Sequence, residues 1–537
     1  MDKTSQHIGA LITDLREAQG FTQTDLAKKL KTTQSAVARI ETGKQNISAD
    51  MLQKIGTALK KNLVTLSPGT VNLSIEGGQK LKGTVVTNTS KNGAVALLCA
   101  SLLNHGTTRL RRMPRIEEVH RLIEVLHSLG IKVDWDGSDV VIKRPKELKF
   151  KNIDVEAAKK TRSIIMFIGP LLHQLSKFSL PQSGGCKLGS RTVRPHFFAL
   201  EDFGININVT DSSFEIEQNE KFSDARRGKG AKRAVLSSTV SGVTGTRNKA
   251  GGNFTTVREI ILYESGDTVT ENALMAAALS TSTTVIKYAS ANYMVQELCA
   301  FLMMCGVRIE GIGTTTLKVT GVEKINLELD YTLSEDPTDS MFFLAAAAVT
   351  NSSLTIERCP IEFLELELLK LEKMGFKYTS SKVYLSHNGL TKLVDIKTKT
   401  SKLTASPEKI YGRPYPGLNI DNLPFFAVIA TQAEGQTLIH DWVYEKRAIY
   451  FTELDKLGAE TVLADPHRIF ITGPTNLHAA ELVCPPALRP ATILLIAMLG
   501  AKGHSVLRNI YSINRGYERL VDRLQALGAK VKYLEEF

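Results

Sequence analysis

The segment SLGIKV at residues 128–133 joins the end of an amphipathic helix to the start of a β-strand. A glycine just past a helix takes the left-handed backbone conformation at little cost, and the β-rich run behind it favours a strand. Copies spaced by roughly 70 to 100 residues predict a repeat architecture. The other five copies are DFGINI at 202–207, MCGVRI at 304–309, KMGFKY at 373–378, KLGAET at 456–461 and ALGAKV at 526–531.

An almost entirely apolar segment precedes each of these glycine stops. Because such a segment offers no polar face to water, we expect it to form a helix that is buried on all sides. A short strand and an amphipathic helix then lead to the stop. The sequence therefore predicts an α/β (α+β) fold of six repeats, arranged as two domains of three repeats with a cleft between them. The apolar segments are NGAVALLCASLL (92–103), TRSIIMFIGPLL (161–172), ENALMAAALS (271–280), DSMFFLAAAAV (339–349), LPFFAVIATQ (423–432) and ATILLIAMLG (491–500).

The composition fits a large protein without membrane-spanning segments. The chain has 537 residues, 43% of them hydrophobic and 23% charged, which is enough for three or more domains. No apolar run is long enough to cross a bilayer, and residues 1–20 lack the basic start and apolar core of a signal peptide. We therefore expect a cytoplasmic protein that contacts no membrane. The net charge of +12 favours anionic partners, such as nucleic acids, nucleotides or phosphorylated metabolites.

One of the six cysteines lies in an unusual setting. Cys186 stands beside paired glycines and several cations in LPQSGGCKLGSRTVRPH, residues 180–196. The positive charges of Lys187, Arg191 and Arg194 favour the thiolate over the thiol. Such a cysteine can protonate or attack an anionic substrate that the arginines hold. A tight glycine turn with a surface thiol is the simpler alternative. The other cysteines show no metal-binding spacing, and most lie in apolar segments where buried free thiols are expected.

Residues 5–63 have the pattern of a compact helical unit, which a Ser-Pro-Gly linker at 67–69 follows. Thr22 and Asp25 form a capping pattern at the start of one helix, and a further helix begins near Gln34. This segment resembles the Cro/repressor-type helix-turn-helix family. The residues that carry the resemblance are Gln23, Leu26, Ala27, Gln34, Ser35, Val37, Ile40, Glu41 and Gly43.

The helix-turn-helix resemblance implies a DNA-binding domain over residues 1–66. Gln34, Ser35 and Arg39 would then face bases or phosphates in the major groove, and Gln23 would fix the DNA backbone. The same fold also serves as a protein-interaction module, which is the alternative. The charge of this segment is only mildly positive, so one copy alone is expected to bind DNA weakly. Whether two copies form a homodimer on DNA is left open.

A basic segment at 221–251 interrupts the third repeat. It carries eight Lys or Arg residues and many Gly and Ser residues. A solvated insertion is the simpler interpretation, and an accessory contact to a nucleic-acid backbone is the alternative.

Four motifs in residues 72–537 together resemble the enolpyruvyl transferase family. The resemblance implies an inside-out α/β barrel of two domains, each built from three βαβαββ-type repeats. It places residues 72–90 with 325–537 in one domain, and residues 91–324, with the Cys186 loop, in the other. It implies no metal and no other cofactor. The motifs are EGGQKLKGTV, SKNGAVALL, SGGCKLGSRTVRPH and INRGYERLVDRLQALGAKV.

The resemblance also implies a reaction and a set of site residues. The enolpyruvyl group of phosphoenolpyruvate would move to the 3-hydroxyl of UDP-N-acetylglucosamine, with release of phosphate, as the first committed step of peptidoglycan synthesis. Cys186 would be the proton donor, and Glu335 or Asp336 would accept the proton of the sugar hydroxyl. The anionic substrate would be held by Lys91, Arg191, Arg489 and Arg515. The sugar nucleotide would be bound by Asn92, Arg162, Val193, His196, Val443 and Arg447.

Some of these residues have simpler roles as alternatives. Arg162 could be a surface cation at a helix start, Arg515 could cap a loop, and His196 could be a packing residue. The sequence also departs from the family pattern, with Arg194 and Ala487 where the family has acids, and ANYMVQEL at 291–298 in place of an acidic motif. A second hypothesis is therefore a transcription regulator that senses a sugar nucleotide in a catalytically weakened cleft. Transfer to shikimate 3-phosphate fits less well, because that relative does not use the cysteine loop.

Overall fold

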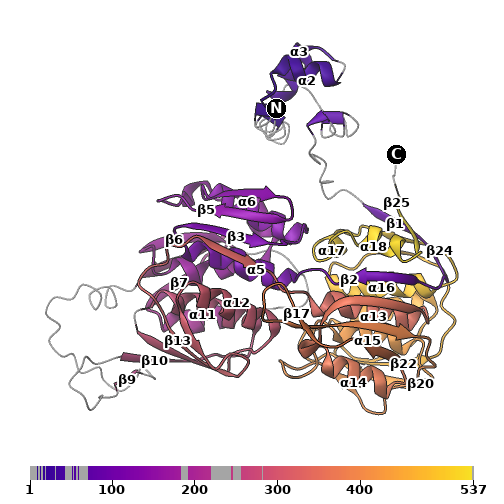
Figure 1. Ribbon diagram of the computed structural model, residues 1–537. Coiled ribbons are helices and arrows are strands. Elements are labelled where there is room, and N and C mark those ends of the chain that lie inside the picture. Colours follow the sequence, from indigo (N-terminus) through magenta and orange to yellow (C-terminus); the bar gives the residue numbers. More distant parts are fainter. Residues whose placement is uncertain are drawn as a thin grey trace. The chain divides into compact units, whose positions relative to one another are not determined.

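The structure is a computed structural model in which the chain forms two units, Met1–Val71 and Asn72–Phe537 (Figure 1). It describes residues 9, 12–13, 16–17, 20–30, 32–42, 51, 54–55, 58–59, 71–182, 192–218, 243–245, 256–280 and 282–534. Cys186, Arg191 and most of the basic segment 221–251 therefore lie outside the described residues. Within the described part, no helix is long and apolar enough to cross a membrane.

The N-terminal unit contains helices α2 (Gln23–Leu30) and α3 (Gln34–Glu41). The expected capping pattern is confirmed, since Thr22 N donates to Asp25 Oδ2 at 2.9 Å and Asp25 N donates to Thr22 Oγ1 at 3.2 Å. Thr33 caps α3 by accepting a hydrogen bond from Ala36 N. A small apolar core holds the helices together, formed by Ile12, Leu26, Ala27, Val37, Ile40, Ile55 and Leu59.

In the C-terminal unit, all six glycine stops adopt the expected left-handed backbone conformation. The φ angles of Gly130, Gly204, Gly306, Gly375, Gly458 and Gly528 lie between +79° and +90°. A helix ends before each glycine and a strand begins shortly after it. The helices are α6 (Glu117–Ser128), α9 (Arg194–Glu201), α12 (Tyr293–Met304), α14 (Glu365–Lys373), η6 (Ala448–Leu457) and α18 (Leu520–Ala526). The strands are β4 (Lys132–Asp136), β7 (Ile205–Val209), β12 (Arg308–Glu310), β16 (Lys377–Ser380), β21 (Glu460–Asp465) and β25 (Lys530–Leu534).

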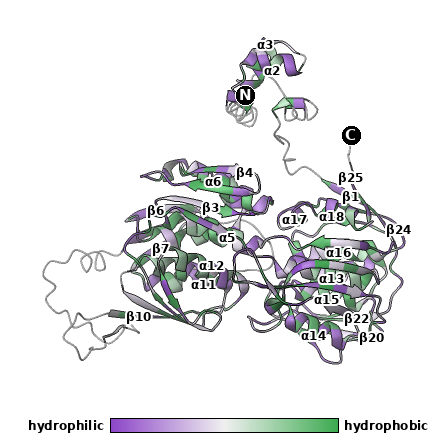
Figure 2. Cartoon of the chain, viewed as in Figure 1, coloured by the Kyte–Doolittle hydropathy of each residue, from purple (hydrophilic) through white to green (hydrophobic). Residues whose placement is uncertain are grey.

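The apolar segments form buried helices, as expected, and hydrophobic residues gather along them in Figure 2. Five are regular α-helices: α5 (Lys91–Ala100), α11 (Asp267–Ala278), α13 (Pro337–Val349), α15 (Leu423–Ala430) and α16 (Leu488–Gly500). The second is irregular and divides into η3 (Arg162–Phe167) and α8 (Ile168–Leu171). There the side chain of Asn272 accepts a hydrogen bond from Gly169 N, so α11 satisfies a backbone group of the irregular helix.

The described residues of this unit form six sheets, which divide into two sets along the chain. The first set has the strand orders β14-β3-β5-β4, β6-β8-β7 and β12-β13-β11-β10-β9. Its remaining strands are β3 (Thr107–Arg111), β5 (Asp139–Lys143), β6 (Lys177–Pro181), β8 (Ser213–Gln218), β9 (Val243–Gly245), β10 (Thr256–Ile261), β11 (Thr283–Lys287), β13 (Thr316–Thr320) and β14 (Leu329–Thr332).

The second set has the strand orders β23-β24-β1-β25, β16-β18-β15-β2 with β17 on β18, and β19-β20-β22-β21. Its remaining strands are β1 (Asn72–Gly77), β2 (Lys82–Val86), β15 (Ser353–Pro360), β17 (Tyr384–Leu385), β18 (Lys392–Lys399), β19 (Ile410–Tyr411), β20 (Gly435–His440), β22 (Arg468–Gly473), β23 (Glu481–Val483) and β24 (Gly503–Arg508). The short helices of the unit are η1 (Ser101–Leu103), η2 (Phe150–Asn152), α7 (Val155–Lys160), η5 (Ile361–Phe363) and α17 (Tyr511–Asn514).

The chain passes between the two sets twice, once after β2 and once after β14. Backbone contacts tie the two passages together, since Ser90 N donates to Ser334 O at 2.8 Å and Thr89 bridges Glu335. Strand β14 pairs in parallel with β3, which puts residues 329–332 in the first set. The division expected between residues 324 and 325 stays a prediction, and we propose that it falls after Thr332.

Candidate active site and nucleic-acid interface

The described site residues of the C-terminal unit gather at the starts of the buried helices. Lys91 and Asn92 begin α5, Arg162 begins η3, Asp336 is the N-cap residue of α13, and Arg489 is the second residue of α16. Backbone N–H groups at a helix start are unpaired and carry partial positive charge, which attracts anions. The repeats therefore supply several such ends, together with cationic side chains, to one region.

Lys91, Asn92 and Asp336 are linked by hydrogen bonds. Lys91 N donates to Asp336 Oδ2 at 3.3 Å, and Lys91 Nζ donates to Asn92 Oδ1 at 3.2 Å. Asn92 Nδ2 in turn donates to the hydroxyl of Tyr293 at 3.3 Å, and that hydroxyl donates to Asp336 Oδ1 at 3.5 Å. Tyr293 belongs to α12, within the segment that departs from the family pattern. Tyr293 thus connects the start of α5 to the N-cap of α13.

Arg489 pairs with a carboxylate that the sequence did not single out. Its Nη2 lies 3.4 Å from Asp421 Oδ2, and its Nη1 donates to the hydroxyl of Tyr517 at 2.9 Å. Burial opposes ionisation of Asp421, but Arg489, Arg447 and Lys91 outweigh it and hold the pKa of Asp421 below its ordinary value. Asp421 is therefore an ionised carboxylate among the cations that are candidates for holding an anionic substrate.

Glu118 brings Arg515 to the same region. Arg515 Nε and Nη2 both donate to Glu118 Oε2, at 3.2 and 2.7 Å, and Thr161 donates to Glu118 Oε1. Burial of Glu118 works against its charge, but Lys91 and Arg515 dominate and lower its pKa. The contact joins α6 of the first set to the turn between α17 and α18 of the second.

Arg447 is buried and supports the turn that carries Asp421. Its Nε donates to Asp441 Oδ2 and its Nη2 donates to Ile420 O at 2.7 Å. The guanidinium group also lies over the ring of Tyr444, 4.1 Å from its centroid. Val443, the other expected sugar-nucleotide residue in this segment, is half-buried nearby in sequence.

Arg162 and His196 flank the downstream end of the Cys186 loop. Arg162 Nη2 donates to Thr192 O at 3.0 Å, which fixes the first described residue after the loop. His196 is buried in α9, with Nδ1 3.2 Å from Asn272 Nδ2 and Nε2 3.3 Å from Thr268 Oγ1. These partners on α11 give His196 the packing role that was the simpler alternative. Val193 is the half-buried N-cap residue of α9.

Glu335 is fully occupied by partners of its own. Its Oε1 accepts hydrogen bonds from Arg112 at 2.7 Å and from Arg358 at 2.6 and 2.9 Å, and its Oε2 accepts one from Ser386 at 2.7 Å. Burial raises the pKa of Glu335, but Ser386 and the two arginines outweigh that effect and lower it. These contacts hold Glu335 in a structural ion pair and leave it poorly suited to accept a proton.

Glu297 lies against the start of α5 and has no cationic partner among the described residues. Its Oε1 accepts a hydrogen bond from Ser334 N at 2.6 Å, while its buried Oε2 makes no hydrogen bond. A Cβ atom placed on Gly93 would lie only 2.0 Å from this Oε2. The absence of a side chain at Gly93 is what allows the carboxylate to approach the first turn of α5.

We therefore expect Gly93→Ala to destabilise the protein by about 1–3 kcal/mol, because the added methyl group overpacks the contact with Glu297. Thermal unfolding of wild type and variant measures the effect. The double variant Gly93→Ala/Glu297→Ala removes the obstructing carboxylate, so the two losses should not add. Additive losses would mean that the methyl group is accommodated elsewhere.

Glu297 also predicts a pH-dependent stability. Burial raises its pKa to about 7, the negative charges of Glu335 and Asp336 act in the same direction, and the hydrogen bonds from Ser334 oppose them. The folded state then holds the proton more tightly than the unfolded state. Stability from this group is therefore full below about pH 4.5 and is lost as pH rises towards 7, by about 3 kcal/mol. Urea unfolding at several pH values, compared with Glu297→Gln, checks this, and a variant that keeps the full pH dependence would contradict it.

In the N-terminal unit, a chain of hydrogen bonds connects the two described helices. Gln34 Nε2 donates to Gln23 Oε1 at 2.6 Å, and Gln23 Nε2 donates to Glu41 Oε2 at 2.8 Å. The buried carboxylate of Glu41 also accepts from Arg16 Nε at 2.6 Å. Gln34, Ser35 and Arg39 are exposed on α3. The expected DNA-reading side chains thus lie on the solvent-facing side of a helix whose start is braced against α2.

Two protein families match the chain. Residues 75–248 and 254–524 match EPSP synthase (3-phosphoshikimate 1-carboxyvinyltransferase), and residues 12–66 match the helix-turn-helix family. The chain belongs to the EPSP synthase family. Among curated relatives, UDP-N-acetylglucosamine 1-carboxyvinyltransferase of Treponema denticola is 33% identical over 86% of this chain and 99% of its own length. The protein of the same name from Bradyrhizobium diazoefficiens is 30% identical over 86% of this chain and 98% of its own length.

Solved structures confirm the EPSP synthase family fold. The enolpyruvyl transferase NikO from Streptomyces tendae superimposes with a TM-score of 0.69 and 22% identity, covering 87% of this chain and 99% of its own. EPSP synthase from Acinetobacter baumannii gives a TM-score of 0.61 and 16% identity, covering 87% and 100%. The resemblance to enolpyruvyl transferases and to a helix-turn-helix head is thereby confirmed, together with the predicted α/β fold.

Sequence reasoning about this member of the EPSP synthase family missed Asp421 and Glu118. Asp421 lies two residues before α15, the fifth buried helix, much as Asp336 lies at the start of the fourth. That shared position was a signal that could have identified it. Glu118 offers no such signal, because a glutamate early in an amphipathic helix is ordinarily a solvated residue.

Proposed function

We propose that this chain transfers the enolpyruvyl group of phosphoenolpyruvate to the 3-hydroxyl of UDP-N-acetylglucosamine and releases phosphate. The observation that carries the proposal is the meeting of Lys91, Arg489 and Asp421 at the starts of α5, α16 and α15. Fixed cations can hold a small phosphorylated acid, and an ionised carboxylate beside them can accept a proton. The names of the curated relatives support this choice of substrates.

In this proposal the chain's own residues divide the chemistry between them. Lys91, Arg191, Arg489 and Arg515 hold the phosphate and carboxylate of phosphoenolpyruvate. The sugar oxygen forms a bond to the central carbon, its proton passes to a carboxylate, and the thiol of Cys186 gives a proton to the methylene carbon. Loss of that added proton and of phosphate from the tetrahedral intermediate then restores the double bond. Asn92, Arg162, Val193, His196, Val443 and Arg447 form the sugar-nucleotide region, with His196 acting through its contacts to α11.

We assign the role of base to Asp421. Glu335 already accepts four hydrogen bonds, three of them from two arginines, and Asp336 caps α13 by accepting from Thr338 N at 2.8 Å. The pKa of Asp336 is raised by burial, with Arg489 opposing, whereas that of Asp421 is lowered. An anionic substrate beside the same cations would offset their charge and raise the pKa of Asp421, which suits it to take a proton.

Phosphate release on mixing the purified full chain with phosphoenolpyruvate and UDP-N-acetylglucosamine tests the proposal. Reactions with phosphoenolpyruvate alone, and with shikimate 3-phosphate as acceptor, are the controls and should give no release. Tight binding of the sugar nucleotide without turnover would instead support the sensor hypothesis. The start of α16 at Ala487, which has no side-chain cap, is the feature that favours this second function.

We further propose that residues 1–66 bind DNA through α3. The match to the helix-turn-helix family and the exposure of Gln34, Ser35 and Arg39 support this assignment. A homodimer on DNA and residence in the cytoplasm are proposed on the sequence alone.

Arg39→Ala should weaken binding to a mixed-sequence DNA duplex and reduce the salt dependence of log K by about one unit of slope, because one phosphate contact is lost. Fluorescence anisotropy at several salt concentrations measures this slope. Lys532→Ala removes an exposed cation from the C-terminal unit and should leave the slope unchanged. An unaltered slope for Arg39→Ala would favour the protein-interaction module.

A further inference from the structure

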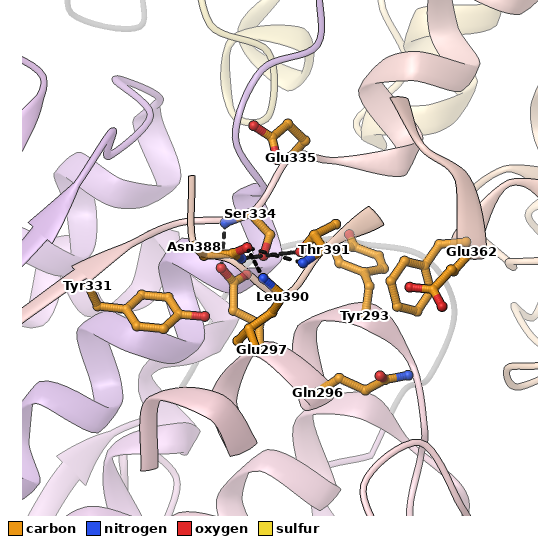
Figure 3. A pocket seen from close by; sticks show the side chains of 11 residues that line it. Tyr293, Gln296, Glu297, Tyr331, Ser334, Glu335, Glu362, Asn388, Leu390 and Thr391 are labelled. Atoms are coloured by element: carbon orange, nitrogen blue, oxygen red, sulfur yellow. Dashed lines mark hydrogen bonds between the residues drawn. The ribbon is translucent and has the colours of Figure 1, made fainter. Parts of the chain in front are cut away.

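A pocket lies where the chain passes from the first set of sheets to the second (Figure 3). It holds about 430 Å³ of space, part of it open to solvent. Glu297 of α12 and Tyr331 of β14 line it from the first set, and Phe363 and Thr391 line it from the second. An occupant would therefore contact both sets. The proposed transfer reaction makes no use of this pocket.

Two polar groups in the wall are buried and have no hydrogen-bond partner. One is Glu297 Oε2, on a residue that is only 5% exposed, and the other is the hydroxyl of Tyr331, which is 3% exposed. The charge of Glu297 contributes, after burial, to raising the pKa of the Tyr331 hydroxyl, which indicates that the two groups are neighbours. Leaving such groups unpaired in the interior is costly, so they mark a place where a ligand is missing.

The other polar side chains of the wall are already engaged with one another. Asn388 Nδ2 donates to Ser334 Oγ at 2.6 Å and to Thr391 Oγ1 at 3.1 Å, as the dashed lines in Figure 3 show. Glu362 pairs with Lys392 at 2.9 Å. Among the residues that the structure describes, none offers a cation to Glu297. The unmet demand in the pocket is therefore for a hydrogen-bond donor that carries positive charge.

Aromatic rings add to this preference. Tyr293 and Phe363 form a T-shaped pair across the pocket, with centroids 5.8 Å apart. The faces of aromatic rings attract ammonium groups, and an ammonium group has three donors for neighbouring acceptors. We propose that this pocket binds the ammonium group of a small organic amine between Glu297 Oε2 and the Tyr331 hydroxyl.

Thermal unfolding of the full chain with methylammonium chloride as the probe tests the proposal. At about 100 mM, methylammonium should raise Tm by about 1–2 °C relative to sodium chloride at equal ionic strength. Glu297→Gln should abolish the rise. Glu362→Gln, the same substitution at a carboxylate of this pocket that already has a partner, should retain it. No rise in wild type, or an equal rise in Glu297→Gln, would overturn the proposal.

Two further arms define the site. An equal rise in potassium chloride would overturn the assignment to an organic amine and point to an inorganic monovalent cation. Tyr331→Phe keeps the carboxylate and removes only the hydroxyl, so it should reduce the rise by about half even where Glu297→Gln does not fold. An unchanged rise in Tyr331→Phe would overturn the placement between the two groups. Because the readout is stability, its failure would leave the proposed transfer reaction untouched.

Discussion

Asp421→Asn is expected to lower kcat for phosphate release by roughly 10²- to 10⁴-fold, the range for loss of a general base. Asparagine keeps the size and can still contact Arg489, but it cannot take the proton of the sugar hydroxyl. The unfolding midpoint should change little by comparison, because the carboxylate is partly exposed, with 26% of its side chain accessible. Steady-state kinetics of phosphate release, with KM measured for both substrates, checks this result.

Two matched aspartates make that result specific. Asp465→Asn removes a carboxylate that pairs with Arg468 on an exposed strand, and it should leave kcat unchanged. Asp336→Asn removes the N-cap of α13 and should mainly lower stability, by about 1 kcal/mol. A larger loss of kcat in Asp336→Asn than in Asp421→Asn would transfer the role of base to Asp336.

Glu335→Gln should lower the free energy of unfolding by about 3 kcal/mol, because it leaves two guanidinium groups without a counter-charge. The Glu335 side chain is fully buried, whereas those of Arg112 and Arg358 are 29% and 18% exposed, so the loss falls at the lower end for a broken buried pair. Both arginines also occupy the left-handed region, with φ of 58° and 63°, which the ion pair helps to maintain. Urea unfolding measures the effect.

Glu310→Gln is the surface counterpart of that change. Glu310 also contacts two cations, Arg308 at 2.8 Å and Lys318 at 3.4 Å, but all three side chains are exposed. Its loss should cost less than about 1 kcal/mol, because water screens exposed pairs. If Glu335→Gln were as stable as wild type and instead lost turnover, Glu335 would be catalytic and its ion pairs incidental.

Local features of this chain followed from its sequence with little ambiguity. The glycine stops, the apolar segments and the Thr22–Asp25 cap each depend on residues close together in the chain, and each is confirmed. The irregular second helix was not foreseen, because its geometry depends on a hydrogen bond from Gly169 to Asn272, which is distant in sequence.

The candidate site was predicted less completely, and the reason is the repeat itself. Several repeats place a polar residue just ahead of a buried helix, so the sequence alone offers Asp336 and Asp421 as similar candidates. Only the packing of α13, α15 and α16 shows that Asp421 faces Arg489. Likewise, nothing near Glu335 in the sequence indicates that Arg112 and Arg358 converge on it.

The sequence by itself determined the number and order of the repeats, the family and the helix-turn-helix head, because these depend on periodic apolar residues, turn glycines and local motifs. The tertiary structure decided which carboxylates are ionised, paired or left without a partner, as for Asp421, Glu335 and Glu297. Those properties depend on burial and on charges contributed by other repeats, and neither can be inferred from neighbours along the chain.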